Sequence, residues 1–236
     1  MTRRTLFSLA TLGLLVVGAI VAVRAWSAAE AEAHRAERAA QRAERLEAFD
    51  ERMGQVVEES RGLMPDVVGN VALGFTMAQV RDARGARLGP APTSAMGLVM
   101  LEERLENGGQ VMYGFERGGQ RLVQVQILSM LPSADAIAPH LAAMNDTYGR
   151  PTGIWDCPTT GGVPTRRFTW RRAHTTVSDV FLVYGDRISL TFYIATSDQI
   201  GLSLRMASCT PVPVDGIAEF PVATAEQMER AAREGR

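Results

Sequence analysis

The pattern of hydrophobic and polar positions starts with a long apolar run. From Thr5 to Val23, 19 residues carry no charge, and arginines bound this run at both ends. As a helix the run would extend about 28 Å at roughly 1.5 Å per residue, close to the thickness of a bilayer's hydrocarbon core. We therefore predict that residues 1–25 form a transmembrane anchor.

A cleaved signal peptide is the alternative interpretation of the same run. Ala25, Ser27 and Ala29 supply small residues of the kind that a signal peptidase recognises. Arginines on both sides of the run leave the membrane orientation open. Under either interpretation we expect most of the chain to leave the cytoplasm. If the run is a transmembrane anchor, which is the interpretation we favour, we expect a single-pass membrane localisation with an extracytoplasmic, periplasmic domain.

Residues 26–61 have the pattern of a helical stalk. The segment Ser27-Ala-Ala-Glu30 fits a capping box at a helix start, and Gly62 and Pro65 fit a helix end. Apolar residues recur every three or four positions between these ends, at Ala36, Ala39, Ala43, Leu46, Phe49, Met53 and Val56. The stripe allows a coiled-coil homodimer, but its first half is only alanine, which favours a solvated stalk whose last turns contact the next domain.

The pattern changes at residues 62–210 to short alternating segments separated by glycine turns, which is typical of antiparallel strands. We interpret this region as an α+β domain made of two copies of a helix followed by three strands, at about 66–131 and 132–210. The first helix begins at a capping box, Thr76-Met-Ala-Gln79, and breaks near Gly85. The second runs from about Asp135 to Tyr148, before a glycine.

A family resemblance accompanies this layout. The segment Gly74-Phe-Thr-Met-Ala-Gln-Val80, followed by Leu88-Gly-Pro90, resembles the G-M-T-x-x-Q-V…L-G-x-P pattern of the SmpA/OmlA family of outer-membrane assembly lipoproteins. The tandem layout is similar to the β-lactamase inhibitor protein fold. The resemblance implies a fold and a cell-envelope setting, while the lipid-bearing cysteine of that family is absent after the apolar run.

Composition excludes several classes of enzyme. The chain has 236 residues and a net charge of −1, so no overall charge indicates nucleic-acid binding. All 25 basic residues are arginine. Without lysine the chain cannot form an ordinary P-loop, a protein-kinase site, a Schiff base or an S-x-x-K serine site.

Cys157 and Cys209 are the two cysteines of the chain. Neither belongs to a metal-binding motif, and an exported domain favours a disulfide between them over two free thiols. A catalytic pair of Cys157 with His174 is the rival hypothesis. Asp156, Asp179 and Asp186 are the carboxylates that could gather in space, although turns and strand edges are their ordinary place.

No hydrolase, zinc-protease or dinucleotide-binding motif is present, so we predict no catalytic, cofactor or metal residues. The segment from Arg166 to Arg172 interleaves arginines with Phe168 and Trp170. Strand alternation directs the two aromatic residues to the core and Arg167 and Arg171 outward. These two arginines form a candidate anion or partner patch, with a solvated strand face as the alternative.

The remaining 26 residues, 211–236, form a proline-containing tail that ends in a short helix from Thr224. Taken together, these features predict a membrane-anchored, non-enzymatic envelope protein whose α+β domain binds another protein. An exported anion-binding, ligand-binding or inhibitory module is the alternative. The expected partners are the membrane and an envelope protein, without nucleic acid.

Overall fold

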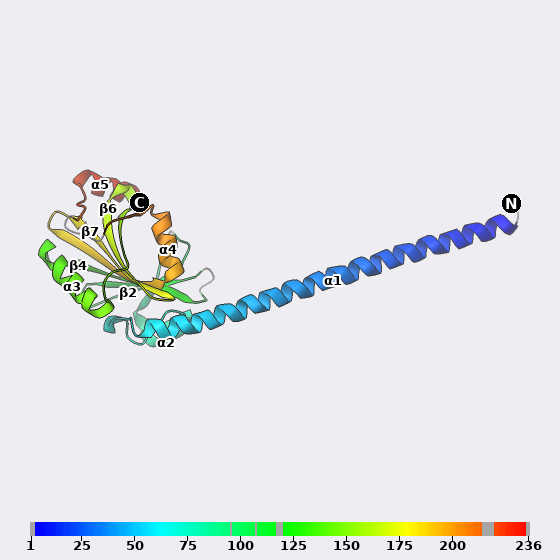
Figure 1. The fold of residues 1–236 in the computed structure, drawn as a ribbon, viewed down its shortest axis with the longest axis horizontal. Helices are drawn as coiled ribbons and strands as arrows, with labels where there is room; N and C mark the ends of the chain where they lie inside the picture. Colours follow the sequence, from blue (N-terminus) through cyan, green and yellow to red (C-terminus); the bar gives the residue numbers. More distant parts are fainter. Residues whose placement is uncertain (1–2, 95, 107, 117–119, 214–219, 235–236) are drawn as a thin grey trace. The chain divides into compact units, whose positions relative to one another are not determined.

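One helix of 59 residues, α1 (Arg3–Arg61), begins the chain in the computed structural model (Figure 1). The structure describes residues 3–94, 96–106, 108–116, 120–213 and 220–234, and the side chains of most residues before 30, and of 31, 46 and 160, are outside this description. The chain divides into two compact units, Met1–Arg52 and Met53–Arg236. The helix passes through Ser27, where the capping pattern predicted a start.

The structure corrects the prediction of a membrane anchor. The predicted span lies in residues 1–25, whose side chains are outside the described part of the chain. Within the described part, no helix combines the length and the apolar character needed to cross a bilayer. The physical reason is that a span needs about 20 consecutive apolar residues, whereas α1 carries charged residues throughout its described length from Glu30 onward. The structure therefore contradicts the predictions of a transmembrane helix and of a single-pass membrane localisation.

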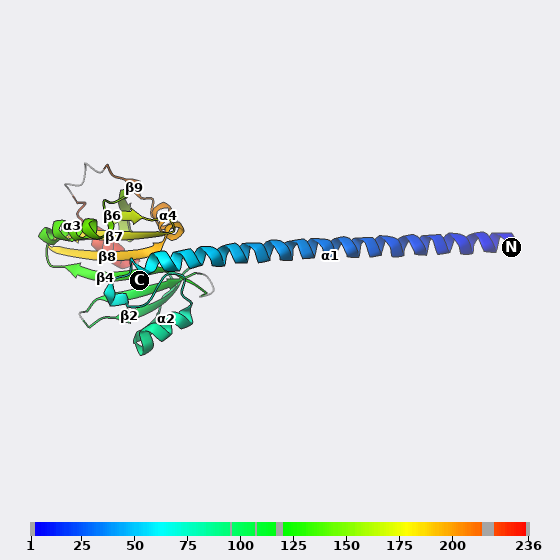
Figure 2. The ribbon, with the colours of Figure 1, turned by 60° about the horizontal axis from the view of Figure 1, so that its bottom comes forward.

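The second unit is built on a single antiparallel sheet. Its nine strands lie in the order β1-β2-β3-β4-β8-β7-β6-β5-β9, and Figure 2 shows the labelled strands β6, β7, β8, β4 and β2 one below another in that order. The strands are β1 (Leu88–Ala91), β2 (Val99–Arg104), β3 (Gln110–Phe115), β4 (Leu122–Leu131), β5 (Gly153–Pro158), β6 (Pro164–Arg171), β7 (Thr175–Tyr184), β8 (Arg187–Thr196) and β9 (Thr210–Pro211).

The helices of this unit alternate with groups of strands. They are α2 (Met77–Arg84), α3 (Ile137–Tyr148), α4 (Ser197–Met206) and α5 (Ala225–Glu234), with short 3-10 turns at Asp66–Val68, Gly85–Arg87, Ala134–Ala136 and Thr160–Gly162. The first copy is thus α2 with β1 to β4, and the second is α3 with β5 to β8. The copies meet where β4 pairs with β8, from Gln124–Ala195 to Leu131–Ile188.

The prediction of three strands per copy is wrong, because each copy has four in one continuous sheet. The pattern missed β1 and β5. The segment Leu88-Gly-Pro-Ala91 contains helix-terminating residues, yet it pairs with β2 along its whole length. Proline is tolerated there because β1 is an edge strand and needs to pair on one side only.

Three predicted helix boundaries are confirmed. Thr76 and Gln79 form the reciprocal capping box at the start of α2, with the Thr76 amide 2.8 Å from the Gln79 side-chain oxygen. Gly85 ends α2 at φ +66°, a conformation that glycine adopts without strain. Helix α3 ends at Tyr148, directly before Gly149, as the pattern predicted.

One face of the sheet, which we call the covered face, forms the core of the second unit. Alternate residues of the strands are buried there, among them Val111, Tyr113, Phe115, Val125, Phe168, Trp170, Val177, Phe181, Ile188 and Ile194. The end of α1, α2 and α3 contact this side. Glu59 of α1 accepts hydrogen bonds from the amides and hydroxyl of the β6–β7 turn, at His174 and Thr175, and Tyr148 of α3 donates to Leu63.

The last turns of α1 and the C-terminal helix also belong to the second unit. Met53, Val56 and Ser60 are buried, so the packed part of α1 begins before residue 62. Helix α5 starts at the predicted Thr224 cap, whose hydroxyl accepts from the Gln227 amide at 3.2 Å. Gln227 donates to the Gly162 carbonyl, so this end of the chain contacts the β5–β6 connection.

Candidate functional site

The other face of the sheet is the candidate binding surface, and we call it the open face. It consists of those residues of β3, β4, β7 and β8 that point away from the core and are not buried, apart from the Tyr184–Arg187 pair at the β7–β8 turn. Gln124, Thr176, Ser178 and Ala195 point to the same side but are buried. The residues of the open face are half-buried or exposed: Gln110, Met112, Gln126, Leu128, Met130, Val180, Leu182, Ser189, Thr191 and Tyr193. Their partners across the strands place them in one continuous area, with Leu128 opposite both Gln110 and Thr191.

The composition of the open face differs from that of an ordinary solvated sheet. Five of its ten residues are apolar, and none is charged. Arg187, at the β7–β8 turn, is the one charged residue that these four strands direct to this side. A sheet face that meets only water usually carries polar and charged residues at these positions, so the open face has more apolar character than solvation requires.

Helix α4 covers the neighbouring part of the same side, over β6 and β7. Figure 1 shows α3 and α4 on opposite sides of the strands. Thr176 of β7 and Ser197 of α4 share a hydrogen bond of 3.0 Å. Between α4 and the sheet lies a cavity of about 170 Å³ lined by the hydroxyl-bearing residues Thr152, Thr169, Thr176 and Ser197, with Trp155 and Arg171.

The two arginines of the predicted patch share one side of β6 but not one environment. Arg171 is exposed, while Arg167 is only 5% exposed beneath α4. The Arg167 guanidinium donates to the Ser203 hydroxyl at 3.0 Å and lies 5.1 Å from the centre of the Tyr193 ring. Burial lowers the pKa of Arg167, an effect that Tyr193 partly offsets. Alternation therefore predicted the side of the strand, and α4 accounts for the burial that the pattern missed.

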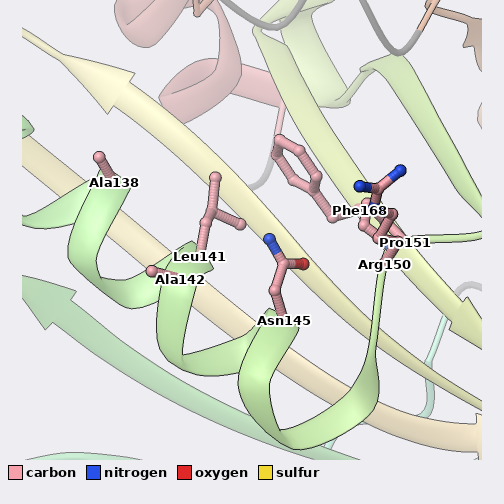
Figure 3. A pocket seen from close by; sticks show the side chains of 7 residues that line it. All are labelled: Ala138, Leu141, Ala142, Asn145, Arg150, Pro151 and Phe168. Atoms are coloured by element: carbon pink, nitrogen blue, oxygen red, sulfur yellow. The ribbon is translucent and has the colours of Figure 1, made fainter.

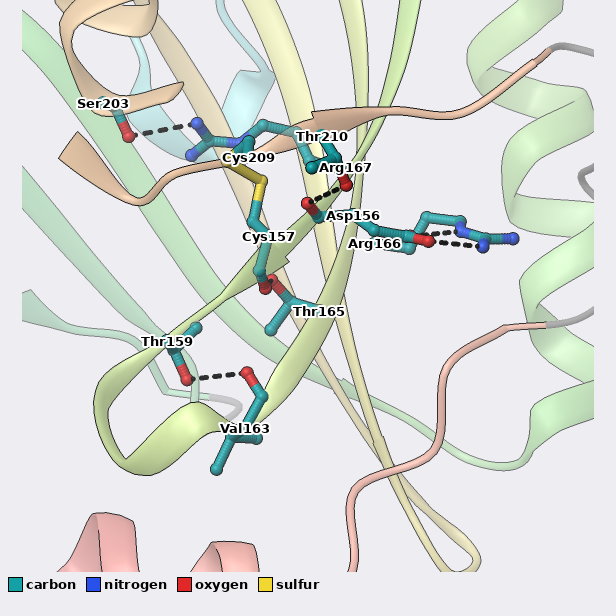
Figure 4. The surroundings of a disulfide bond; sticks show 10 residues. All are labelled: Asp156, Cys157, Thr159, Val163, Thr165, Arg166, Arg167, Ser203, Cys209 and Thr210. Atoms are coloured by element: carbon teal, nitrogen blue, oxygen red, sulfur yellow. Dashed lines mark hydrogen bonds and ion pairs between the residues drawn. A yellow bond between two sulfur atoms is a disulfide. The ribbon is translucent and has the colours of Figure 1, made fainter. Parts of the chain in front are cut away.

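The predicted disulfide between Cys157 and Cys209 is confirmed (Figure 4). It joins β5 to the segment that follows α4, directly before β9 pairs with β5. The rival catalytic pair of Cys157 with His174 is therefore excluded, because the sulfur is already bonded. The Thr165 hydroxyl donates to the Cys157 carbonyl at 2.8 Å, which adds a second link between β5 and β6.

The three aspartates named as a potential cluster lie apart. Asp156 forms a two-point ion pair with Arg166, at 2.8 and 3.0 Å, as Figure 4 shows. Asp179 is buried on the covered face and lies 2.8 Å from the His140 ring nitrogen of α3. Asp186 is exposed in the β7–β8 turn. In the part of the chain that the structure describes, no group of three or more His, Cys, Asp or Glu residues could hold a metal ion.

A second buried carboxylate lies in the first copy. Glu103 of β2 accepts two hydrogen bonds from Arg84 of α2, at 2.8 and 2.7 Å, and one from the Tyr113 hydroxyl at 2.9 Å. Arg84 also donates to the carbonyls of Val67 and Val68. This network fastens α2 and the segment after α1 to the sheet, so its role is structural.

Sequence reasoning missed the open face as a site, although a signal for it was present. In β4, Gln124, Gln126 and Leu128 alternate with the apolar Val123, Val125 and Ile127. The side that should be solvated thus lacks the charges expected of it. The charge of arginine marks it as a candidate binding residue, whereas neutral side chains such as Met112 and Thr191 carry no comparable signal.

Comparison with known proteins adds no assignment to this geometry. No protein-family model matches the chain, and no curated protein or solved structure matches it either. The resemblance to the SmpA/OmlA family and to the β-lactamase inhibitor protein fold therefore stays a prediction, and the candidate site rests on the open face itself.

Proposed function

We propose that this chain is a non-enzymatic protein-binding module of an oxidising compartment, and that it contacts its partner through the open face. The observation that carries the proposal is the composition of that face. It extends across four adjacent strands, half of its residues are apolar and none is charged, and Arg187, the one charged residue that these strands direct to this side, lies at the β7–β8 turn.

A protein is the partner that best fits such a surface. Small molecules bind mainly in concave sites that enclose most of their surface, whereas the open face is a broad area of sheet. The cores of protein interfaces are depleted in charged residues and enriched in tyrosine, methionine and arginine. Tyr193, Met112 and Met130 lie on the open face, and methionine adapts its shape easily to a partner.

The disulfide supports the proposed compartment. Disulfides form and persist in oxidising environments and are rare in the reducing cytosol. The Cys157–Cys209 bond is therefore typical of an exported protein. A homodimer through residues 26–61 stays a prediction, and it would double the number of open faces in one assembly.

Anion binding at Arg167 and Arg171 is the alternative function, and it has less support. The Arg167 guanidinium already contacts Ser203 and Tyr193 beneath α4, so an anion could reach it only if α4 moved. Arg171 alone is exposed. If this alternative holds, an Arg171→Glu variant will lose binding while open-face variants keep it.

The test is affinity capture with the full-length chain as bait in extracts of the source organism. A bait carrying Leu128→Glu and Thr191→Glu places two charges in the middle of the open face, since these residues are direct neighbours across β4 and β8. A bait with Ala143→Glu on the exposed surface of α3 is the matched control. Near-ultraviolet circular dichroism of each bait confirms that it is folded.

We expect one partner to be captured by the original chain and by the Ala143→Glu bait, and to be lost from the double variant. Charges that become buried without a partner weaken binding strongly, because their hydration is lost without compensation. Equal capture by all three baits would refute the open face as the contact. Recovery of the original chain without any partner would count against the proposed function as a whole.

A further inference from the structure

A groove beside α3 lies on the opposite side of the molecule from the open face. It has a volume of about 620 Å³ and runs between α3, the α3–β5 connection and β6. Figure 3 shows its lining residues directed toward a common space: Ala138, Leu141, Ala142 and Asn145 from α3, Arg150 and Pro151 from the connection, and Phe168 from β6. The volume is within the range of about 300–1,000 Å³ that is usual for ligand sites.

The lining of the groove is apolar along α3 and polar at one end. Ala138, Leu141 and Ala142 are separated by three and four positions, so they share one side of the helix. The two alanines are exposed, although a helix surface that meets only water usually carries polar or charged residues. Their small side chains leave the space that the groove occupies, and the Phe168 ring forms an apolar wall.

Asn145 and Arg150 give the groove a polar, cationic end. Both residues are exposed, and the lining contains no acidic residue. Among the described residues, the Arg150 guanidinium has neither an ion pair nor a hydrogen bond to another side chain. A positive charge at one end of an apolar groove is complementary to a molecule that is apolar along its length and anionic at one end.

We propose that this groove binds a free medium-chain fatty acid, with the alkyl chain along Ala138, Leu141 and Ala142 and the carboxylate at Arg150 and Asn145. The guanidinium of arginine pairs with a carboxylate through two parallel hydrogen bonds, which makes it a suitable group for the anionic end. The alkyl chain gains affinity by leaving water, and its length sets how much apolar surface is covered. The site is independent of the open face and does not rest on the proposed function.

The first test is a calorimetric titration of the full-length chain with octanoate, nonanoate and decanoate, each below its micelle concentration. Burial of one methylene group contributes enough to raise affinity about fourfold. We therefore expect one binding site per chain and an increase of about fourfold for each added carbon until the groove is filled. Binding that is not saturable, or that does not depend on chain length, would overturn the proposal.

The second test separates the carboxylate from the alkyl chain. Arg150→Gln should weaken decanoate binding about tenfold, since charge-assisted hydrogen bonds are among the stronger ones, and should leave decanol binding unchanged. Ala142→Trp should abolish binding of both ligands by filling the groove. Arg171→Gln removes an exposed arginine elsewhere and should have no effect.

The double variant with Leu128→Glu and Thr191→Glu distinguishes this site from the proposed protein contact. It should bind decanoate as the original chain does, even though it loses the captured partner. Decanoate binding that survives both Arg150→Gln and Ala142→Trp would place the fatty acid elsewhere on the molecule and refute the groove.

Discussion

The two copies of the helix-and-strand unit differ in how each treats its buried carboxylate. In the first copy, Glu103 of β2 receives three hydrogen bonds, two from Arg84 of α2 and one from Tyr113. In the second, Asp179 of β7 receives one, from His140 of α3. The other Asp179 oxygen is buried without a hydrogen bond among the described residues.

The pKa values of the two acids shift in opposite directions for this reason. Burial alone would raise the pKa of Glu103, but the hydrogen bonds from Arg84 and Tyr113 and the nearby positive charges outweigh it, so that pKa is lowered. Burial raises the pKa of Asp179, and His140 offsets only part of the effect. The comparison teaches that a carboxylate shielded from solvent can be stabilised or destabilised in its ionised form, and that the number of hydrogen bonds it accepts contributes to the difference.

The other sides of the two copies differ as well. The second copy carries α4 and the disulfide over its strands β5 to β7, whereas β3 and β4 of the first copy contribute the open face with β7 and β8. Under the proposed function, a partner would contact the part of this side of the sheet that α4 leaves uncovered. The following predictions test these differences, in order of expected effect.

Arg84→Ala should produce the largest loss, about 3–5 kcal/mol in the free energy of unfolding, because Glu103 would be left buried without its cation. Arg87→Ala is the matched control, since Arg87 is exposed and 4.0 Å from the same carboxylate; it should change stability by less than about 1 kcal/mol. Chemical denaturation measures both. Similar losses in the free energy of unfolding for the two variants would contradict the role of Arg84 in holding α2 on the sheet.

Replacement of both cysteines, Cys157→Ser with Cys209→Ser, should reduce the free energy of unfolding by about 2–5 kcal/mol, because the unfolded chain would no longer be cross-linked. The same denaturation experiment, with and without a reducing agent, checks the result on the original chain. Identical unfolding midpoints under the two conditions would show that the bond does not stabilise the fold.

Glu103→Gln and Asp179→Asn should change the pH dependence of stability in opposite senses. A lowered pKa means that Glu103 stabilises the fold above its usual pKa and that this contribution is lost as the pH falls through the folded-state pKa. A raised pKa means that the fold favours protonated Asp179, so its contribution decreases as the pH rises from the usual aspartate pKa through the raised one. Unfolding measured across acidic to neutral pH should show the two trends, and parallel trends would disprove the comparison.

Met130→Ala should have the smallest effect, within about 0.5 kcal/mol, because this open-face side chain is 60% exposed. Leu190→Ala in the neighbouring strand β8 removes a buried side chain on the covered face and should reduce stability by about 2–5 kcal/mol. If thermal or chemical unfolding gave equal losses for the two variants, the open face would be covered in solution.

Local signals predicted part of this structure well. The Thr76–Gln79 capping box, the end of α2 at Gly85 and the end of α3 before Gly149 depend on neighbouring residues only, and all are confirmed. The cysteine pair was predicted from its number and expected compartment rather than from geometry. Interactions among a few neighbouring residues determine the helix boundaries, and the chemistry of cysteine determines the disulfide.

Tertiary features were harder to predict from the sequence. Strand β1 exists because β2 offers it a partner, which a Gly-Pro segment does not reveal. Arg167 is buried because α4 returns over β6, and the sequence gives no direct signal for that return. The open face was missed because its signal is the absence of charge on alternate positions.

Site-specific photocrosslinking tests the central proposal most directly. A photoreactive residue would replace Met130 on the open face or Val222 outside it, two apolar positions with similar exposure, 60% and 57%. In cells of the source organism, we predict a crosslinked protein partner at position 130 and none at 222. Crosslinking of the same partner at 222 but not at 130 would contradict the open face as the binding surface, and no crosslink at either position would contradict the proposed function.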